Sequence, residues 1–111
     1  MSQVTTVIAT RDRWSDLATS LPHHEHPVVL IDNGSQDDTP ALVRKRFPGV
    51  QVIEAGRNLG AVARNLGVRA ATTPYVAFAD DDSWWAPGAL DRAAEHFDAH
   101  PRLALVAARI L

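Results

Sequence analysis

Short apolar runs rich in β-branched residues alternate along the chain with segments whose apolar residues recur every three or four positions. The short runs predict five strands, at residues 4–9, 28–32, 50–54, 75–79 and 103–108. The segments between them predict four helices, at about 14–20, 38–47, 60–71 and 87–100. Such alternation is typical of a parallel sheet, and near-continuous apolar strands indicate cover on both faces. The sequence therefore predicts an α/β fold, a three-layer αβα sandwich with a mainly parallel sheet.

Size and composition narrow the class of protein. The 111 residues suit a single domain, residues 1–111, that buries roughly two thirds of its unfolded surface. A net charge of -2 without a basic face argues against a nucleic-acid partner. There is no cysteine, which excludes disulfides and thiolate metal sites and fits a cytoplasmic location. We expect no membrane span, because no apolar run approaches ~20 residues, and no signal peptide, because the residues after Met1 lack its basic and apolar regions.

The fourth predicted strand ends abruptly in three aspartates, Asp80, Asp81 and Asp82. Adjacent carboxylates repel one another, and a bound Mg²⁺ or Mn²⁺ with oxygen ligands is the usual relief. The alternative is a solvated acidic loop in which Asp82 or Ser83 caps the helix that contains Pro87. The three aspartates alone leave both interpretations open.

Polar loops also follow the first three predicted strands, at residues 10–13, 32–39 and 56–60. Ligands of an open parallel sheet bind at the carboxyl ends of its strands, near the point where strand order reverses. We therefore expect these loops and the three aspartates to meet at one edge. A glycine-rich loop after the first strand is missing, which argues against dinucleotide dehydrogenases and P-loop NTPases.

Four sequence motifs around these loops narrow the class of ligand and of protein. They are VIATRDR (7–13), IDNGSQDDT (31–39), NLGAVARNLG (58–67) and FADDDSWWAP (78–87). In order and spacing this series resembles the donor-binding half of a family 2 glycosyltransferase with the GT-A fold, over most of residues 4–90. The resemblance implies a Rossmann-like nucleotide-binding half and inverting transfer of a sugar from a nucleotide diphosphate donor, a UDP-sugar, with Mn²⁺ or Mg²⁺.

The resemblance also implies roles for individual residues. Nucleotide binding falls to Thr10, Arg11, Asp12, Asp32, Asn58, Arg64, Asp80 and Asp81, and metal binding to Asp80 and Asp82. Asp32 would accept a hydrogen bond from an N–H of the base, most simply uracil N3. Asp82 would bind the metal at the diphosphate, Asp80 would lie near the ribose or metal, and Asp81 fills the variable position. Arg64 would reach the phosphates or form an ion pair with the metal loop.

Three positions depart from the common family pattern. Arg11 stands where many relatives have an aromatic ring beside the base, and its planar guanidinium could stack there instead. Asn33 replaces a second aspartate, which removes one charge and spares Asp32. Arg64 is one residue closer to Gly60 than usual, a rotation of about 100° on a helix.

Family 2 enzymes continue for about another hundred residues, which carry the acceptor site and the general base. We find no candidate for that base and expect a domain truncated before the acceptor half. It is a fragment, a truncated gene product, or a donor-binding domain completed by another subunit, and a homo-oligomer stays open as well. The acceptor, whether glycan, lipid or small molecule, stays open. The alternative function is a non-catalytic nucleotide-sugar-binding or assembly module, and a purely structural module would bind no nucleotide.

Two further groups of residues receive a plainer interpretation. The histidine-rich run at residues 23–26 is predicted to be a solvated loop at the amino end of the second strand, away from the site. His96 and His100 are predicted to face solvent as a pair on one helix. Of Trp84 and Trp85, we expect one to pack beneath the metal loop and the other to line an acceptor pocket or an oligomer contact.

Overall fold

The computed structural model describes residues 2–107, which form one parallel sheet flanked by helices. The strands are β1 (Val4–Thr10), β2 (Val28–Asp32), β3 (Gln51–Glu54) and β4 (Tyr75–Ala79). The α-helices are α1 (Trp14–Ser20), α2 (Thr39–Arg46), α3 (Arg64–Ala70) and α4 (Ala89–Ala99), and the 3₁₀ helices are η1 (Leu21–His23) and η2 (Gly60–Ala63). All strand pairs are parallel, in the order β3-β2-β1-β4. The predicted α/β class is confirmed.

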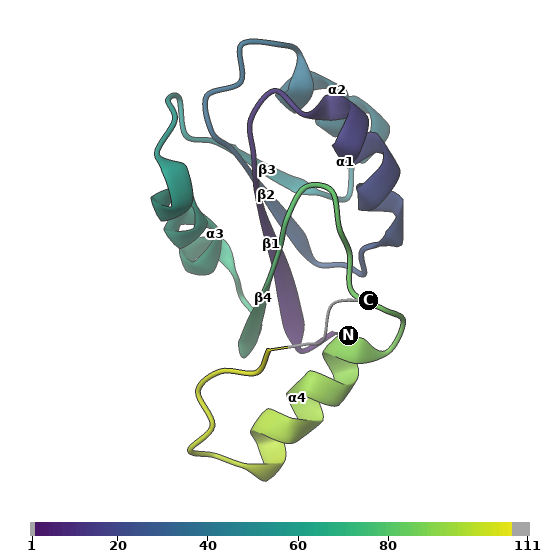
Figure 1. Cartoon of the computed structure of the whole chain (residues 1–111), viewed down its shortest axis with the longest axis vertical. Coiled ribbons are helices and arrows are strands. Elements are labelled where there is room, and N and C mark those ends of the chain that lie inside the picture. Colours follow the sequence, from purple (N-terminus) through teal and green to yellow (C-terminus); the bar gives the residue numbers. More distant parts are fainter. Residues whose placement is uncertain (1, 108–111) are drawn as a thin grey trace.

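Helices cover both faces of the sheet, because successive side chains of each buried strand point to opposite sides. On one face, Ile8 and Leu30 pack with Leu17 of α1 and Val43 of α2. Helix α4 covers a separate cluster that contains Val4 and Ala77 of β1 and β4. Figure 1 shows α3 on the side of the sheet opposite α1 and α2. These layers form the predicted three-layer sandwich.

The second face depends on a close approach between α3 and β1. There Val7, Val29 and Ile31 of the sheet pack with Ala63 of η2. A Cβ atom built on Gly67 would lie 2.3 Å from Val7 Cγ1, far inside van der Waals contact. A glycine at this position therefore allows the helix to lie directly on the central strand.

Several predicted elements need correction. Residues 103–107 form no strand, and Ala108 lies outside the described residues. Apolar character alone does not make a strand, because the backbone must also find a pairing partner. The helix predicted from residue 60 starts as the 3₁₀ turn η2 and becomes α-helical only at Arg64. Helix α4 begins at Ala89 after Gly88, whose φ is 80°, so neither Asp82 nor Ser83 caps it.

Strand order reverses between β1 and β4. The chain adds β2 and then β3 on one side of β1, and β4 on the other. Side chains after β1 and β4 therefore border the switch point, where ligands of open α/β sheets bind. Among residues 2–107, no helix has the length and apolar character needed to cross a membrane.

Candidate functional site

Asp81 is the buried member of the aspartate triplet (residues 80–82). Its Oδ2 accepts a hydrogen bond from Thr10 Oγ1 at 2.9 Å, and Arg13 Nε lies 3.1 Å from its Oδ1. Burial raises the pKa of Asp81, while the bond from Thr10 and the charge of Arg13 act against that rise. The residue at the variable position of the family motif thus anchors the loop after β4 to the end of β1.

Asp80 and Asp82 instead present their carboxylates to solvent, with side chains 72% and 56% exposed. Arg64 Nη2 lies 3.3 Å from Asp80 Oδ1, so the ion pair between Arg64 and this loop is present. Arg13 Nη2 is 3.8 Å from Asp82 Oδ2. Exposed pairs of this kind are weak. Both carboxylates therefore remain available to a ligand.

The loop after β4 also contacts the histidine-rich run. His23, Glu25 and His26 are exposed, as the predicted solvated loop requires, but His24 is buried, and for this residue the prediction was wrong. His24 is only 7% exposed, and its Nε2 lies 3.1 Å from the carbonyl oxygen of Ser83. The His23 ring stacks on Trp84 with centroids 4.1 Å apart. The run does lie at the amino end of β2, as predicted, but the loop after β4 returns to meet it. Of the two tryptophans, Trp85 packs against the cluster under α4, and Trp84 is exposed.

A polar cavity of about 510 Å³ lies over the carboxyl ends of β2 and β3. Its lining consists of Arg11, Asp32, Gly34, Ser35, Gln36, Glu54, Gly56, Arg57 and Asn58. Asp32 is 3% exposed, and its two carboxylate oxygens accept hydrogen bonds from the N–H and the hydroxyl of Ser35, at 2.9 and 2.6 Å. The Asp32 carboxylate is therefore held in a fixed direction in the wall of the cavity, at the start of the β2–α2 loop.

Close contacts hold the loop after β2 against the loop after β3, and both loops line the cavity. Gly34 has φ 78°, and a Cβ on it would lie 2.8 Å from the backbone of Arg57. Asn33 bridges the loops, because its Oδ1 accepts from Leu59 N at 2.7 Å and its Nδ2 donates to the carbonyl oxygen of Gly60 at 3.0 Å. The two loops thus approach closely enough to share a cavity.

Asp12 organises the neighbouring loop rather than lining the cavity. It has φ 53°, and its Oδ1 accepts hydrogen bonds from the backbone N–H groups of Gln36 and Asp37, at 2.7 and 3.1 Å. These two bonds lower the pKa of Asp12. The carboxylate therefore ties the β1–α1 loop to the β2–α2 loop.

The predicted nucleotide-binding residues fall into three groups. Arg11, Asp32 and Asn58 line the cavity. The aspartate triplet lies after β4, at the opposite end of the carboxyl edge of the sheet, and Arg64 pairs with it there. Thr10 and Asp12 instead join loops to one another, Thr10 to the loop after β4 and Asp12 to the β2–α2 loop.

Sequence reasoning missed the roles of Arg13, Ser35, Glu54 and Arg57. Arg13, Ser35 and Arg57 did carry a signal, because each lies in one of the polar loops after the predicted strands, whereas Glu54 lies within a predicted strand. Within residues 2–107, no group of three or more His, Cys, Asp or Glu side chains is arranged to hold a metal ion by itself.

Comparison with known proteins identifies the fold and the family. The family model described as "Glycosyl transferase family 2" matches residues 7–111. The N-acetylglucosaminyl-diphospho-decaprenol L-rhamnosyltransferase of Mycobacterium tuberculosis is 36% identical over 87 residues, which cover 68% of this chain and 28% of that protein.

Two solved structures share the architecture. A mannosyltransferase from Pyrobaculum calidifontis, in complex with GDP-Man and Mn²⁺, matches with a TM-score of 0.74 and 27% identity over 86% of this chain and 32% of its own. S. aureus TarS 1-349, in complex with UDP-GlcNAc, matches with a TM-score of 0.74 and 25% identity over 91% of this chain and 32% of its own. This chain spans about a third or less of each of these three proteins. The sheet and its helices have the GT-A fold, and the chain belongs to glycosyl transferase family 2.

Proposed function

We propose that this chain binds the nucleotide diphosphate sugar donor of a glycosyltransferase. The base would occupy the cavity over β2 and β3, and the diphosphate would lie beside Asp80 and Asp82. One observation carries the proposal: a polar cavity with a buried carboxylate and a cluster of exposed carboxylates lie at the same edge of the sheet, on either side of its switch point. The matched structures with UDP-GlcNAc and GDP-Man support a donor of this class.

Asp32 has the right chemistry for the base. Each oxygen of an ionised carboxylate has about two acceptor directions, and Ser35 uses one on each oxygen. The remaining directions can accept the N3–H of uracil, and we propose a UDP-sugar on this ground. Arg11 on the wall of the cavity supplies a planar cation that stacks on a base. Guanine, with its own N–H donors, is the competing base that the experiment below includes.

Asp80 and Asp82 suit a hard divalent cation, because such ions take carboxylate oxygens as ligands. Their exposed side chains would hold Mn²⁺ or Mg²⁺, with the other coordination positions left to diphosphate oxygens and water. When bound, the cation would offset the negative charge of the diphosphate leaving group. The chain's own contribution is to orient these carboxylates: Arg13 and Arg64 balance them, and the buried Asp81 fixes the loop that carries them.

Transfer also requires a general base that deprotonates the acceptor hydroxyl. We assign that base to no residue of this chain, and we propose inverting transfer to a glycan, lipid or small-molecule acceptor for the complete enzyme only. The alternative is a non-catalytic module that binds the donor at the same site. The two functions share the donor site and differ in whether donor hydrolysis or transfer follows binding.

The proposal is tested by calorimetric titration of UDP, GDP and dTDP with Mn²⁺, with Mg²⁺ and with a chelator. We expect UDP to bind in the presence of metal and to lose affinity when the metal is chelated. Asp32→Asn should weaken UDP binding by about 1.5 to 3 kcal/mol, the usual value of a charged hydrogen bond. Glu95→Gln on the exposed surface of α4 makes the same charge change and should leave affinity unaltered. Folded protein that binds none of the three diphosphates would overturn the proposal.

A further inference from the structure

The segment between β4 and α4, residues 80–88, does not end at the carboxyl edge of the sheet. In Figure 1 this green segment rises from the end of β4, turns over and descends on the side of α1 to the start of α4. It therefore carries the aspartate triplet past the turn where α1 passes into η1. Helix α1 ends there at Ser20, and η1 continues from Leu21 to His23.

Two side chains of this turn hold the segment by its backbone. Ser20 Oγ donates to the carbonyl oxygen of Asp81 at 2.8 Å, and His24 Nε2 lies 3.1 Å from the carbonyl oxygen of Ser83. Ser20 is fully buried and His24 nearly so, which keeps water from competing for either bond. The two carbonyl groups belong to the residues on either side of Asp82. The backbone of Asp82 is therefore fixed from both directions.

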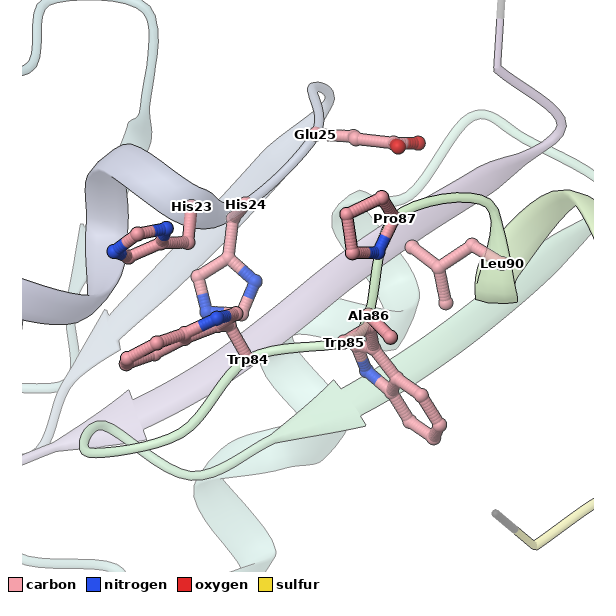
Figure 2. Close-up of a pocket in the computed structure, with 8 residues that line it drawn as sticks. All are labelled: His23, His24, Glu25, Trp84, Trp85, Ala86, Pro87 and Leu90. Carbon is pink, nitrogen blue, oxygen red and sulfur yellow. The ribbon is translucent and has the colours of Figure 1, made fainter. Parts of the chain in front are cut away.

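The chemistry of the His24 contact is defined by its partner. A carbonyl oxygen only accepts, so Nε2 must carry the proton and donate it. Burial lowers the pKa of His24, which leaves the neutral ring with its proton on Nε2. Beside it, His23 stacks on Trp84 with the two planes 12° apart, and Figure 2 shows both histidines next to this indole. The stack adds a third contact to the same segment.

We propose that Ser20 and His24 form a two-point clamp that positions Asp82 for the cation, and this role rests on the proposed function. The side chain of Asp82 is exposed, and among residues 2–107 its one ion pair is the 3.8 Å contact with Arg13. Its direction must therefore come from its backbone, which the clamp holds. Ser20 and His24 touch neither donor nor cation, so they act as positioning residues of the donor site.

The test compares Ser20→Ala and His24→Phe with the unaltered chain. Alanine removes the hydroxyl, and phenylalanine keeps the ring while removing its donor. Thr19→Ala is the matched control, because the Thr19 hydroxyl is exposed and donates within α1, to the carbonyl oxygen of Ser15. Two readouts are needed: amide hydrogen exchange of residues 80–86 without metal, and the affinity for UDP with Mn²⁺ and with chelator.

We expect His24→Phe and Ser20→Ala each to weaken Mn²⁺-dependent UDP binding about tenfold, as for one lost buried hydrogen bond. Binding in chelator should be unchanged, because the base cavity is not touched. Exchange in residues 80–86 should accelerate in both variants and not in Thr19→Ala. His24→Gln, whose amide N–H reaches a similar place, should recover part of the affinity.

Each other outcome overturns a separate claim. If the unaltered chain binds UDP with Mn²⁺ and both variants bind equally well, the clamp does not position Asp82 and the donor site stands. If amide exchange in residues 80–86 is the same in both variants as in the unaltered chain, the clamp is also overturned, whatever the measured affinity for UDP. If the unaltered chain shows no metal-dependent binding, the proposed function fails, and the positioning role fails with it.

Discussion

The bridge made by Asn33 leads to a specific prediction, because an aspartate at this position would keep the shape of the side chain and lose its N–H donor. Asn33 is 7% exposed and uses both ends of its amide, Oδ1 for Leu59 N and Nδ2 for the Gly60 carbonyl. The Leu59 N–H fixes which end is oxygen. Asn33→Asp would keep the first bond and turn the second into two oxygens facing each other across 3.0 Å.

The expected cost follows from that contact. A buried acceptor left without its donor costs about 1 to 3 kcal/mol, and burial of the new charge adds to it. We expect the free energy of unfolding to fall by about 2 to 3 kcal/mol at neutral pH. Burial raises the pKa of the introduced carboxyl, and the protonated form donates again. Stability should therefore return as the pH falls through that raised pKa and be lost above it.

Equilibrium urea unfolding measures the effect. With a slope of about 1 to 3 kcal/mol per molar urea, the midpoint should drop by about 0.7 to 3 M. Asn58→Asp is the matched control, because Asn58 is exposed and its Oδ1 only accepts, from Gly60 N at 2.9 Å, which a carboxylate does equally well. Equal midpoints for the two variants, or a loss for Asn33→Asp that does not change with pH, would refute the reasoning.

Two more predictions concern the aspartate triplet. Asp82→Asn should weaken metal-dependent nucleotide binding by about 1 to 3 kcal/mol, measured by calorimetry. The urea unfolding midpoint should stay unchanged, because the Asp82 side chain is exposed. Unaltered affinity would mean that Asp82 is not a metal ligand. Asp81→Asn should change stability with pH, because burial raises the pKa of Asp81 above its ordinary 3.8. The stability that its protonated carboxyl contributes is present below that value and lost as the pH rises through the raised pKa. Urea unfolding from about pH 3 to about pH 7 should favour the variant progressively, whereas a constant difference would contradict the assignment.

The central strands β1 and β2 could be predicted from the sequence, because a strand buried on both faces must be largely apolar. The edge strand β4 is only partly buried, and its aromatic and β-branched residues indicated it. Residues 28–32 and 75–79 were predicted with the bounds that the structure shows. The convergence of the polar loops followed from parallel topology alone. The predicted strand at residues 103–108 was wrong over its described part, since pairing depends on a partner that local pattern does not reveal.

The internal organisation of the site was beyond sequence reasoning. Asp81 was assigned the variable position, yet it is the anchor, because only the folded loop brings it to Thr10 and Arg13. His24 was placed in a solvated loop because nothing in its neighbours indicates that residues 80–88 return to cover it. Irregular segments lack the periodicity that predicts which side chains they bury. The roles of residues outside helices and strands therefore required the structure.

Among the described residues, β4 pairs only with β1, so its outer edge presents unpaired N–H and C=O groups. Phe78 on this strand is 45% exposed, with the Arg64 guanidinium 5.8 Å from its ring centroid. An exposed edge of this kind is a template for strand addition between molecules, and cationic side chains are a common protection against it. Within residues 2–107, β3 pairs only with β2, so the sheet has a second open edge, and strand addition between molecules can start at either one. At the β4 edge, the arginine that balances Asp80 is also the cation beside the exposed Phe78 ring, so one side chain serves both the acidic loop and the strand edge.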